Sequence, residues 1–224
     1  MSASIFIALQ RGKPCRAGPD RALYAALLTP QGKTLFDFLV WPGAAGEVLI
    51  DCEADAAEDL AKRLSLYRLR RKIAIAVDAG VAVHWQAEMG DGGAADPRLA
   101  ALGQRWLAPV ADSDEAADAD WRAHRLALGV PEGRAELGDI LWLETNAVEL
   151  HGVSFSKGCY IGQENTARMH YRNKVNRRLV AIDRCRRAEH HGSHLCTLHG
   201  LKQCQSAGHI AVIVAQGFGH RFTH

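Results

Sequence analysis

The sequence lacks long apolar runs, a clear excess of charge of one sign, and regularly spaced cysteines. Its longest apolar stretches, such as residues 210–215, have the length of a strand, whereas a membrane-spanning helix needs about 20 apolar residues. The 27 basic and 25 acidic residues leave a net charge of +2, which predicts no bulk binding to nucleic acid or membrane and leaves only a local patch. The six cysteines follow no disulfide-scaffold spacing, so we expect reduced thiols and a cytoplasmic location.

The motifs of several enzyme classes are also missing. The sequence contains no glycine-rich phosphate loop, no G-x-S-x-G and no H-E-x-x-H. Seven of the eleven histidines and three of the six cysteines follow residue 184, but their spacing matches no zinc-binding unit. We therefore predict no physiological metal site.

Alternating apolar residues predict two hairpins on either side of a helix. The first hairpin combines residues 35–40 with 48–51, and the second combines 73–77 with 81–85, each around a turn that contains glycine. Residues 53–67 favour a helix, because Leu60, Leu64 and Tyr67 share one face and acid-first i,i+4 pairs occur at Glu58–Lys62 and Asp59–Arg63. This order indicates an α+β fold with mostly antiparallel sheets.

A second helix is expected over residues 112–128. Asp112 and Glu115 have the spacing of a capping box at its start, and Gly129 followed by Pro131 marks its end. Residues 132–156 have mixed polarity and predict loops and short elements. A strand is expected over residues 178–182, after which the hydrophobic periodicity is lost until residues 210–214.

The segment at residues 157–164, K-G-C-Y-I-G-Q-E, has an unusual composition. Two glycines flank Cys159, and glycine permits close backbone approach to a ligand. The cation of Lys157 lies two residues before the thiol and favours its reactive thiolate form. These residues are consistent with a reactive thiol on a tight loop, and the alternative is an inert, buried cysteine in a glycine turn.

This segment resembles the K-G-C-[YF]-x-G-Q-E signature of the YgfZ family. Members of that family are folate-binding proteins related to the aminomethyltransferase of the glycine cleavage system, and mitochondrial iron–sulfur assembly factors share the signature. Further segments resemble family motifs in the same order along the chain: A-A-L-L-T-P-Q-G-K at 25–33, D-P-R-L at 96–99, G-Q-R at 103–105, L-A-L-G-V-P at 126–131 and L-H-G-V-S-F at 150–155. The resemblance covers roughly residues 20–183.

The resemblance implies an aminomethyltransferase-like folate-binding fold. Residues 1–110 would form the N-terminal folate-binding sheet and helix region, and residues 111–177 a ferredoxin-like region that carries the cysteine motif. Residues 178–224 would be a reduced or aberrant C-terminal barrel, since their composition departs from the family. The implied function is folate-dependent support of the assembly or repair of iron–sulfur enzymes, including enzymes that modify tRNA. A eukaryotic member would be located in the mitochondrial matrix.

The resemblance also implies site residues around tetrahydrofolate or a derivative. Asp37 would contact the pterin, because a carboxylate accepts from both the ring N–H and the amino group; the alternative is an aspartate on the solvent face of an edge strand. Cys159 would supply a thiol for redox chemistry, for sulfur or cluster contact, or for positioning the loop. The remaining expected binding residues are Asn146, Lys157, Gly158, Tyr160, Gly162, Gln163, Glu164 and Arg168. Glu164 and Arg168 have an alternative interpretation as a helix-surface ion pair.

Two other functions stay open at this point. One is a true aminomethyltransferase that transfers a one-carbon unit to tetrahydrofolate, although the cysteine signature marks the assembly branch and argues against it. The other is a tRNA-binding module that uses the basic run at residues 168–178 with Tyr171 as a stacking ring. That run has two further interpretations, as a solvated face or as a site for the glutamate tail of a folate. The expected partners are therefore a folate, iron–sulfur assembly or client proteins, and weakly tRNA.

Overall fold

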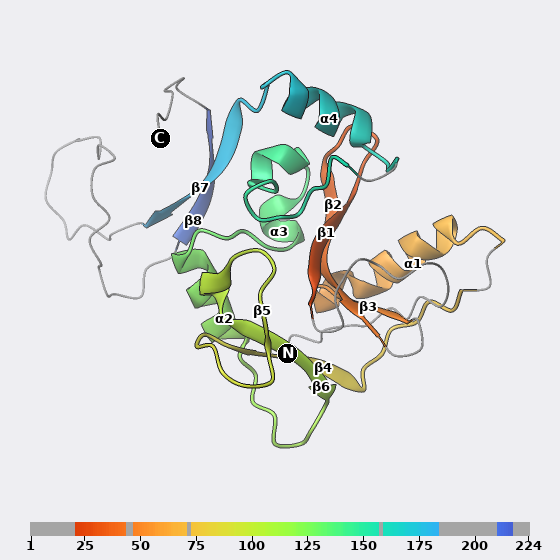
Figure 1. The fold of residues 1–224 in the computed structure, drawn as a ribbon, viewed down its shortest axis with the longest axis vertical. Helices are drawn as coiled ribbons and strands as arrows, with labels where there is room; N and C mark the ends of the chain where they lie inside the picture. The colour runs from red at the N-terminus through yellow and green to blue at the C-terminus, as the bar shows by residue number, and fades with distance from the viewer. Residues whose placement is uncertain (1–20, 44–46, 71–72, 157–158, 184–209, 217–224) are drawn as a thin grey trace, which may run out of the picture.

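The computed structural model describes residues 21–43, 47–70, 73–156, 159–183 and 210–216. These residues form an α+β architecture in which the sheets are antiparallel (Figure 1). The first sheet contains β1 (Leu23–Leu28), β2 (Thr34–Pro42) and β3 (Val48–Asp51), in that order. The second contains β4 (Val81–Gln86), β6 (Gln104–Pro109) and β5 (Ala94–Ala95), with β6 in the middle. The third is the pair β7 (Arg177–Asp183) and β8 (Ile210–Gln216). The helices are α1 (Ala57–Tyr67), α2 (Asp118–Ala127), α3 (Arg134–Leu137) and α4 (Gln163–Tyr171).

The first sheet is buried on both faces, with β2 at its centre. On one face Phe36 and Phe38 pack with Leu60 of α1 in a compact apolar cluster. Because successive strand residues point to opposite faces, Leu39 and Trp41 lie on the other face, in the larger cluster. Asp37 shares that second face and is therefore carried into the interior of the molecule.

The helices cover the first sheet from different sides (Figure 1). Helix α1 lies beside one face, and α3 lies between the other face and the β7–β8 pair; α2 lies below α3 and β8 in this view. Helix α4 lies over the end of the β1–β2 hairpin, where the Asn165 side chain donates a 2.8 Å hydrogen bond to the carbonyl of Gln31. The segment after α3 is bound to the start of β2, because the Thr34 amide donates to the carbonyl of Ile140 at 2.9 Å.

Several sequence predictions are confirmed. The α+β class, the antiparallel β2–β3 pair and helix α1 occur where they were expected, and β7 contains the predicted strand at 178–182. Residues 132–156 hold only short elements, namely α3 and a 3₁₀ turn at Trp142–Thr145. Strand β1 was not predicted, although Tyr24, Ala26 and Leu28 alternate on one side of it. The three-part domain division, the ferredoxin-like region and the barrel remain predictions.

The second predicted hairpin is wrong. Residues 73–77 alternate as a strand would, and Ile75 and Val77 pack partly against the α1 side of the first sheet, but they are not in a strand. Strand β4 pairs instead with β6, in a register that runs from Val81–Pro109 to Gln86–Gln104. A six-residue ladder with a distant segment therefore replaces the local pairing.

The start of the second predicted helix is also wrong. Helix α2 begins at Asp118, and its N-cap Ala117 makes no side-chain capping bond. Asp114 instead accepts a 2.8 Å hydrogen bond from the Ala111 amide, which stabilises a turn before the helix. The predicted end is right, because Gly129 has a φ of 70° and its amide donates to the carbonyl of Leu126.

The predicted charge pairs on α1 are not formed. Asp59 lies 3.7 Å from Arg134, and the Arg63 guanidinium lies 5.6 Å from the centre of the Tyr67 ring. Among the described residues, no helix is long and apolar enough to cross a membrane.

Candidate functional site

A network of buried charges lies within the larger core cluster. The Arg98 guanidinium donates two hydrogen bonds to the Asp96 carboxylate, at 2.9 and 2.8 Å, and a third to Glu132. The Nε of Arg105 lies 3.0 Å from Asp96 Oδ2, and its Nη1 donates to Asp51 at 3.2 Å. Arg98 is only 2% exposed, so these charges are withdrawn from water and depend on one another.

Trp121 holds the network together from the side of α2. Its ring lies 5.3 Å from the Arg98 guanidinium and 4.1 Å from that of Arg105, and its Nε1 donates to Glu132 at 2.9 Å. Burial by itself would raise the pKa of Glu132, but the surrounding arginines, chiefly Arg98 and Arg105, lower it to about 2. Glu132 therefore stays ionised throughout the physiological pH range.

Asp37 lies next to this network on β2. Its Oδ2 accepts a 3.2 Å hydrogen bond from the Tyr24 hydroxyl, and its Oδ1 accepts a 3.1 Å bond from the Gly133 amide. Burial, with a smaller contribution from Glu132, raises the pKa of Asp37 to about 7, against the opposing effect of Arg98. The alternative interpretation of Asp37 as a solvent-facing residue of an edge strand is wrong, because β2 is the central strand and the side chain is buried.

Glycine at position 133 allows the chain to approach Asp37 this closely. Gly133 has a φ of 81°, and a Cβ there would collide with the carboxylate of Glu53. Glu53 in turn accepts a 2.7 Å hydrogen bond from the Arg134 amide. The segment before α3 is thus fixed against β2 by two carboxylates.

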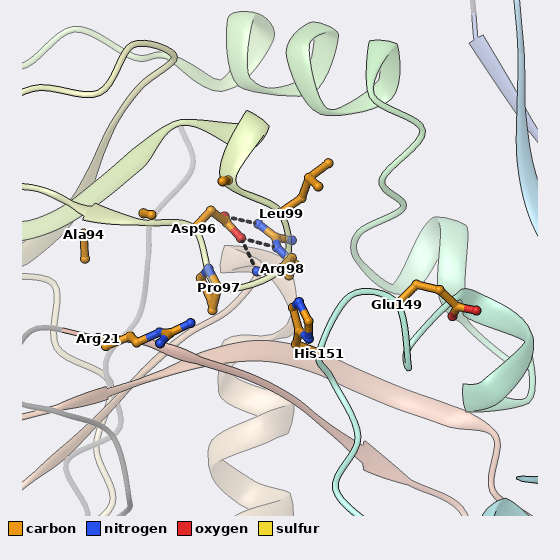
Figure 2. Close-up of a pocket in the computed structure, with 10 residues that line it drawn as sticks. Arg21, Ala94, Asp96, Pro97, Arg98, Leu99, Glu149 and His151 are labelled. Atoms are coloured by element: carbon orange, nitrogen blue, oxygen red, sulfur yellow. Dashed lines mark hydrogen bonds and ion pairs between the residues drawn. The ribbon is translucent and has the colours of Figure 1, made fainter. Parts of the chain in front are cut away.

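A cavity of about 620 Å³ opens beside the network (Figure 2). This volume falls within the range of about 300–1,000 Å³ that small-molecule sites occupy. Its walls come from the start of β1, from β5 and the turn that follows, and from the loop before the cysteine motif; the lining residues are Arg21, Ala94, Ala95, Asp96, Pro97, Arg98, Leu99, Ala100, Glu149 and His151. The cavity is connected to Asp37 through Arg98, whose guanidinium lies 5.3 Å from the Tyr24 ring.

The cysteine motif lies elsewhere, on the turn of the β1–β2 hairpin. Gly162 begins α4 with a φ of 84°, and a Cβ there would lie 2.6 Å from the Thr29 carbonyl oxygen. The Tyr160 amide donates to the Gln163 side chain at 3.2 Å, which closes the loop. Cys159 is exposed and free, so the alternative of a buried cysteine is wrong; Lys157 and Gly158 lie outside the described residues.

Three of the predicted binding residues have structural partners. Glu164 and Arg168 form the exposed ion pair of the alternative interpretation, with side chains 84% and 53% exposed. Asn146 has a left-handed backbone and donates to the Leu179 carbonyl at 2.9 Å, which joins the 3₁₀ turn to β7. None of the predicted site residues that the structure describes lines the cavity beside Arg98.

Asp37 and the cysteine motif are separate in space. Asp37 lies four positions after Lys33 of the hairpin turn, and four steps along an extended strand correspond to about 13 Å. The structure therefore groups Cys159, Tyr160, Gly162, Gln163, Glu164 and Arg168 at one end of the hairpin and leaves Asp37 in the buried network.

Sequence reasoning did not assign Arg98, Arg105 or Glu132 to the site. Each belongs to a segment that resembles the family, in D-P-R-L, in G-Q-R and directly after V-P. That resemblance was the available signal. Nothing in local sequence distinguishes these charges from surface charges, because their burial depends on three distant segments packing together.

The basic run at 168–178 is partly neutralised. Three of its arginines pair with carboxylates: Arg168 with Glu164, Arg177 with Glu144 and Arg178 with Glu149. Tyr171 is 71% exposed, and His170 stacks on Phe155 with ring centres 3.7 Å apart. Within the described part of the chain, Arg172 and Lys174 are the cations of the run that have no carboxylate partner.

The two described cysteines differ sharply in environment. Burial, reinforced by Asp51 and Asp37, raises the pKa of Cys52 to about 12, so this thiol is unreactive at neutral pH. Both cysteines are free, as expected. Among the residues the structure describes, no group of three or more His, Cys, Asp or Glu side chains is arranged to hold a metal ion; the histidines and cysteines after residue 184 lie outside them.

No family model matches the chain, but curated proteins do. The mitochondrial iron–sulfur cluster assembly factor IBA57 of Homo sapiens is 34% identical over 200 residues, which covers 75% of this chain and 56% of the human protein. Its counterpart in Mus musculus is 33% identical over 192 residues, and that of Neurospora crassa is 31% identical over 192 residues.

The homologues of this chain are named as iron–sulfur cluster assembly factors. The matches cover 72% of this chain and 53% of the mouse protein, and 70% of this chain and 44% of the fungal one. The chain thus spans about half the length of the curated relatives it matches. These relatives are named as mitochondrial, which agrees with the expectation of a mitochondrial matrix location for a eukaryotic member.

Proposed function

We propose that this chain supports the assembly or repair of iron–sulfur enzymes. The observation that carries the proposal is its 34% identity over 200 residues with a protein named for that role. The exposed, free thiol of Cys159, on a loop closed by Gln163, supports it, because a thiol that contacts sulfur or iron must be accessible to the partner that carries them. We assign the chain to the YgfZ branch on the strength of the same cysteine signature.

Cys159 alone does not suffice for a stable cluster. Iron–sulfur clusters commonly take four protein ligands. Cys159 would therefore contribute one ligand to a shared or transient site, with the other ligands supplied by a partner. Its motif lies against the hairpin turn, at Thr29 and Gly32, and its exposure leaves the thiol open to such a partner.

We further propose that tetrahydrofolate or a derivative binds beside the buried network. The support is a cavity of about 620 Å³ beside Arg98, whose guanidinium lies over the ring of Tyr24, the hydrogen-bond partner of Asp37. When bound, a tetrahydrofolate supplies a reduced ring system that carries one-carbon units. The side chains of Asp96 and Arg98 are buried and bonded to each other, so they would bound the site rather than donate to the ligand, while Asp37, with a pKa raised to about 7, can accept or release a proton near it.

Rescue of cluster-enzyme activity tests the proposed role. Cells depleted of their own related factor receive the full chain, its Cys159→Ala or Cys159→Ser variant, or Cys52→Ala as a matched control. We expect the wild-type chain and Cys52→Ala to restore the activity of a mitochondrial or cytoplasmic iron–sulfur enzyme and both Cys159 variants to fail, at equal protein levels. No rescue by the wild-type chain would overturn the role, and rescue by both Cys159 variants would make the thiol dispensable.

A further inference from the structure

The end of helix α1 exposes large apolar side chains. Leu66, Tyr67 and Leu69 are 69%, 49% and 85% exposed. The start of the helix packs on the first sheet through Leu60, whereas every residue from 65 to 70 is exposed. Figure 1 shows this end of α1 at the right-hand edge of the molecule, on the opposite side from the β7–β8 pair. We call residues 62–70 the α1 tip; exposed apolar residues gathered in this way are typical of an interaction site.

Leu69 has a backbone conformation that leucine rarely adopts. It follows the C-cap residue Arg68 and has a left-handed φ of 52°. Glycine is the usual residue at this position of a helix end, because the left-handed backbone brings a Cβ too close to a carbonyl oxygen. The Leu69 side chain gains almost no burial in return. A strained residue that holds an apolar side chain in water indicates contact with something outside the chain.

Positive charge surrounds the apolar side chains. The α1 tip carries four cations, namely Lys62, Arg63, Arg68 and Arg70, and the sequence has no acidic residue from 60 to 77. Among the described residues, none of the four forms an ion pair with a carboxylate. The net charge of the whole chain is only +2, so this is a local concentration of charge.

Apolar side chains within a ring of cations suit the surface of an anionic bilayer. We propose that the α1 tip binds anionic phospholipid, with Leu66 and Leu69 inserted at the boundary of the acyl chains and the cations at the phosphates. Insertion is shallow, because the last carbonyl groups of a helix lack intrahelical partners and need water or headgroups. Arginine and tyrosine suit that depth, since each has an apolar body and a polar end. This binding needs neither Cys159 nor the cavity beside Arg98.

Two other anionic partners fit the charge but not the apolar residues. Single-stranded nucleic acid stacks its bases on aromatic rings, and the one aromatic residue of the tip, Tyr67, already lies 5.6 Å from the Arg63 guanidinium. An acidic protein would need a pocket shaped for both leucines. Fluid acyl chains need no matching shape, so a bilayer fits the tip best.

Vesicle flotation with the full chain tests the inference. The vesicles are phosphatidylcholine alone, or phosphatidylcholine with about 30% phosphatidylglycerol as the anionic lipid. The tip variants are Leu66→Gln/Leu69→Asn, in which asparagine tolerates the left-handed backbone, and Lys62→Gln/Arg70→Gln. A single-stranded oligonucleotide and poly-glutamate serve as lipid-free anionic probes.

Each tip variant has a matched control on another surface. Met89→Gln removes an apolar side chain that is 60% exposed. Arg172→Gln/Lys174→Gln removes two exposed cations that have no carboxylate partner among the described residues.

We expect the wild-type chain to float with the anionic vesicles, to remain unbound with the neutral ones, and to be released as the salt concentration rises. Each tip variant should partition about tenfold or more weakly, through loss of two apolar contacts or of two cations. The melting temperature should not fall in either tip variant, because all four side chains are exposed. Both controls should bind as the wild-type chain does.

Three results would overturn the inference. One is a wild-type chain that does not float with anionic vesicles. A second is wild-type partitioning in both tip variants, or equal weakening in the controls, since binding would then not depend on the tip. The third is binding of the oligonucleotide or poly-glutamate that requires the tip while vesicles are not bound, which would assign the tip to a nucleic acid or an acidic protein.

Discussion

The Arg98 guanidinium group is at the centre of the buried network. Its N–H groups donate to Asp96 and Glu132, and it also lies over the rings of Tyr24 and Trp121. Burial opposes the charge of Arg98, but Glu132 and Asp96 outweigh that effect and hold its pKa well above the ordinary value. A planar fork with this many donors has no substitute among the other side chains.

Replacing Arg98 should therefore lower the free energy of unfolding. Arg98→Met leaves the carboxylates of Asp96 and Glu132 buried without their cation, and we expect a loss of about 3–5 kcal/mol in the free energy of unfolding. Arg168→Met, which breaks the exposed pair with Glu164, should cost about 0–1 kcal/mol. Urea unfolding of both variants measures the two losses, and similar values would show that the network is not a buried ionic core.

Asp37 should make the stability depend on pH. Its folded-state pKa of about 7 lies above the unfolded value of 3.8, so the folded protein binds this proton more tightly. The resulting stabilisation is complete below about pH 4 and is lost as the pH rises through 7, at about 1.4 kcal/mol for each unit of pKa difference.

Removing the carboxyl group should remove that pH dependence. In Asp37→Asn, the difference in unfolding free energy between pH 5.5 and pH 8 should be smaller than in the wild-type chain, because this group no longer loses its proton. Chemical unfolding at the two pH values measures it. An identical pH dependence in the two proteins would place the pKa of Asp37 outside this window.

The elements position these residues through packing between distant segments. Strand β2 is buried on both faces because α1 covers one and the α2–α3 region covers the other. The local pattern of residues 35–40 was enough to predict the strand, but it could not show which face Asp37 occupies or what covers it. The failures at 73–77 and at the start of α2 have the same cause, since β6 and the Ala111–Asp114 turn compete successfully with the local preference.

Helix α4 depends on glycine where it meets the β1–β2 hairpin. Gly162→Ala should lower the free energy of unfolding, because its φ of 84° is strained for alanine and the new Cβ would lie 2.6 Å from the Thr29 carbonyl oxygen and 3.0 Å from the Gly32 Cα. We expect about 1–2 kcal/mol from strain and about 1–3 kcal/mol more from the collision. Thermal or urea unfolding gives the total.

Gly92→Ala is the matched control for that substitution. Gly92 has a similar φ of 92°, but a Cβ there meets no heavy atom within 4 Å, so alanine should cost only the strain. The difference between the two variants isolates the contact between α4 and the hairpin. Equal losses would show that the cysteine motif does not depend on close packing against residues 29–32.

At the scale of the whole molecule, the sequence was most informative where a motif is contiguous. The cysteine signature indicated a reactive thiol on a tight loop, with a buried cysteine as the alternative, and Cys159 is exposed. The homologues confirm the link to iron–sulfur cluster assembly factors. The buried network could not be predicted, because Asp37, Arg98 and Glu132 come from three separate segments. Their burial emerges only when β2, the turn after β5 and the segment before α3 pack together.

We propose that the buried network, with the cavity beside it, is a ligand site and not only a core. Titration of the wild-type chain and Asp37→Asn with tetrahydrofolate at pH 7.5, by calorimetry with parallel melting curves, tests it most directly. We predict binding and a raised melting temperature for the wild-type chain, and affinity weakened by about tenfold or more in Asp37→Asn, since an amide replaces one of two acceptors with a donor. Absence of heat and of stabilisation in the wild-type chain, or equal affinity in the two proteins, would contradict the claim.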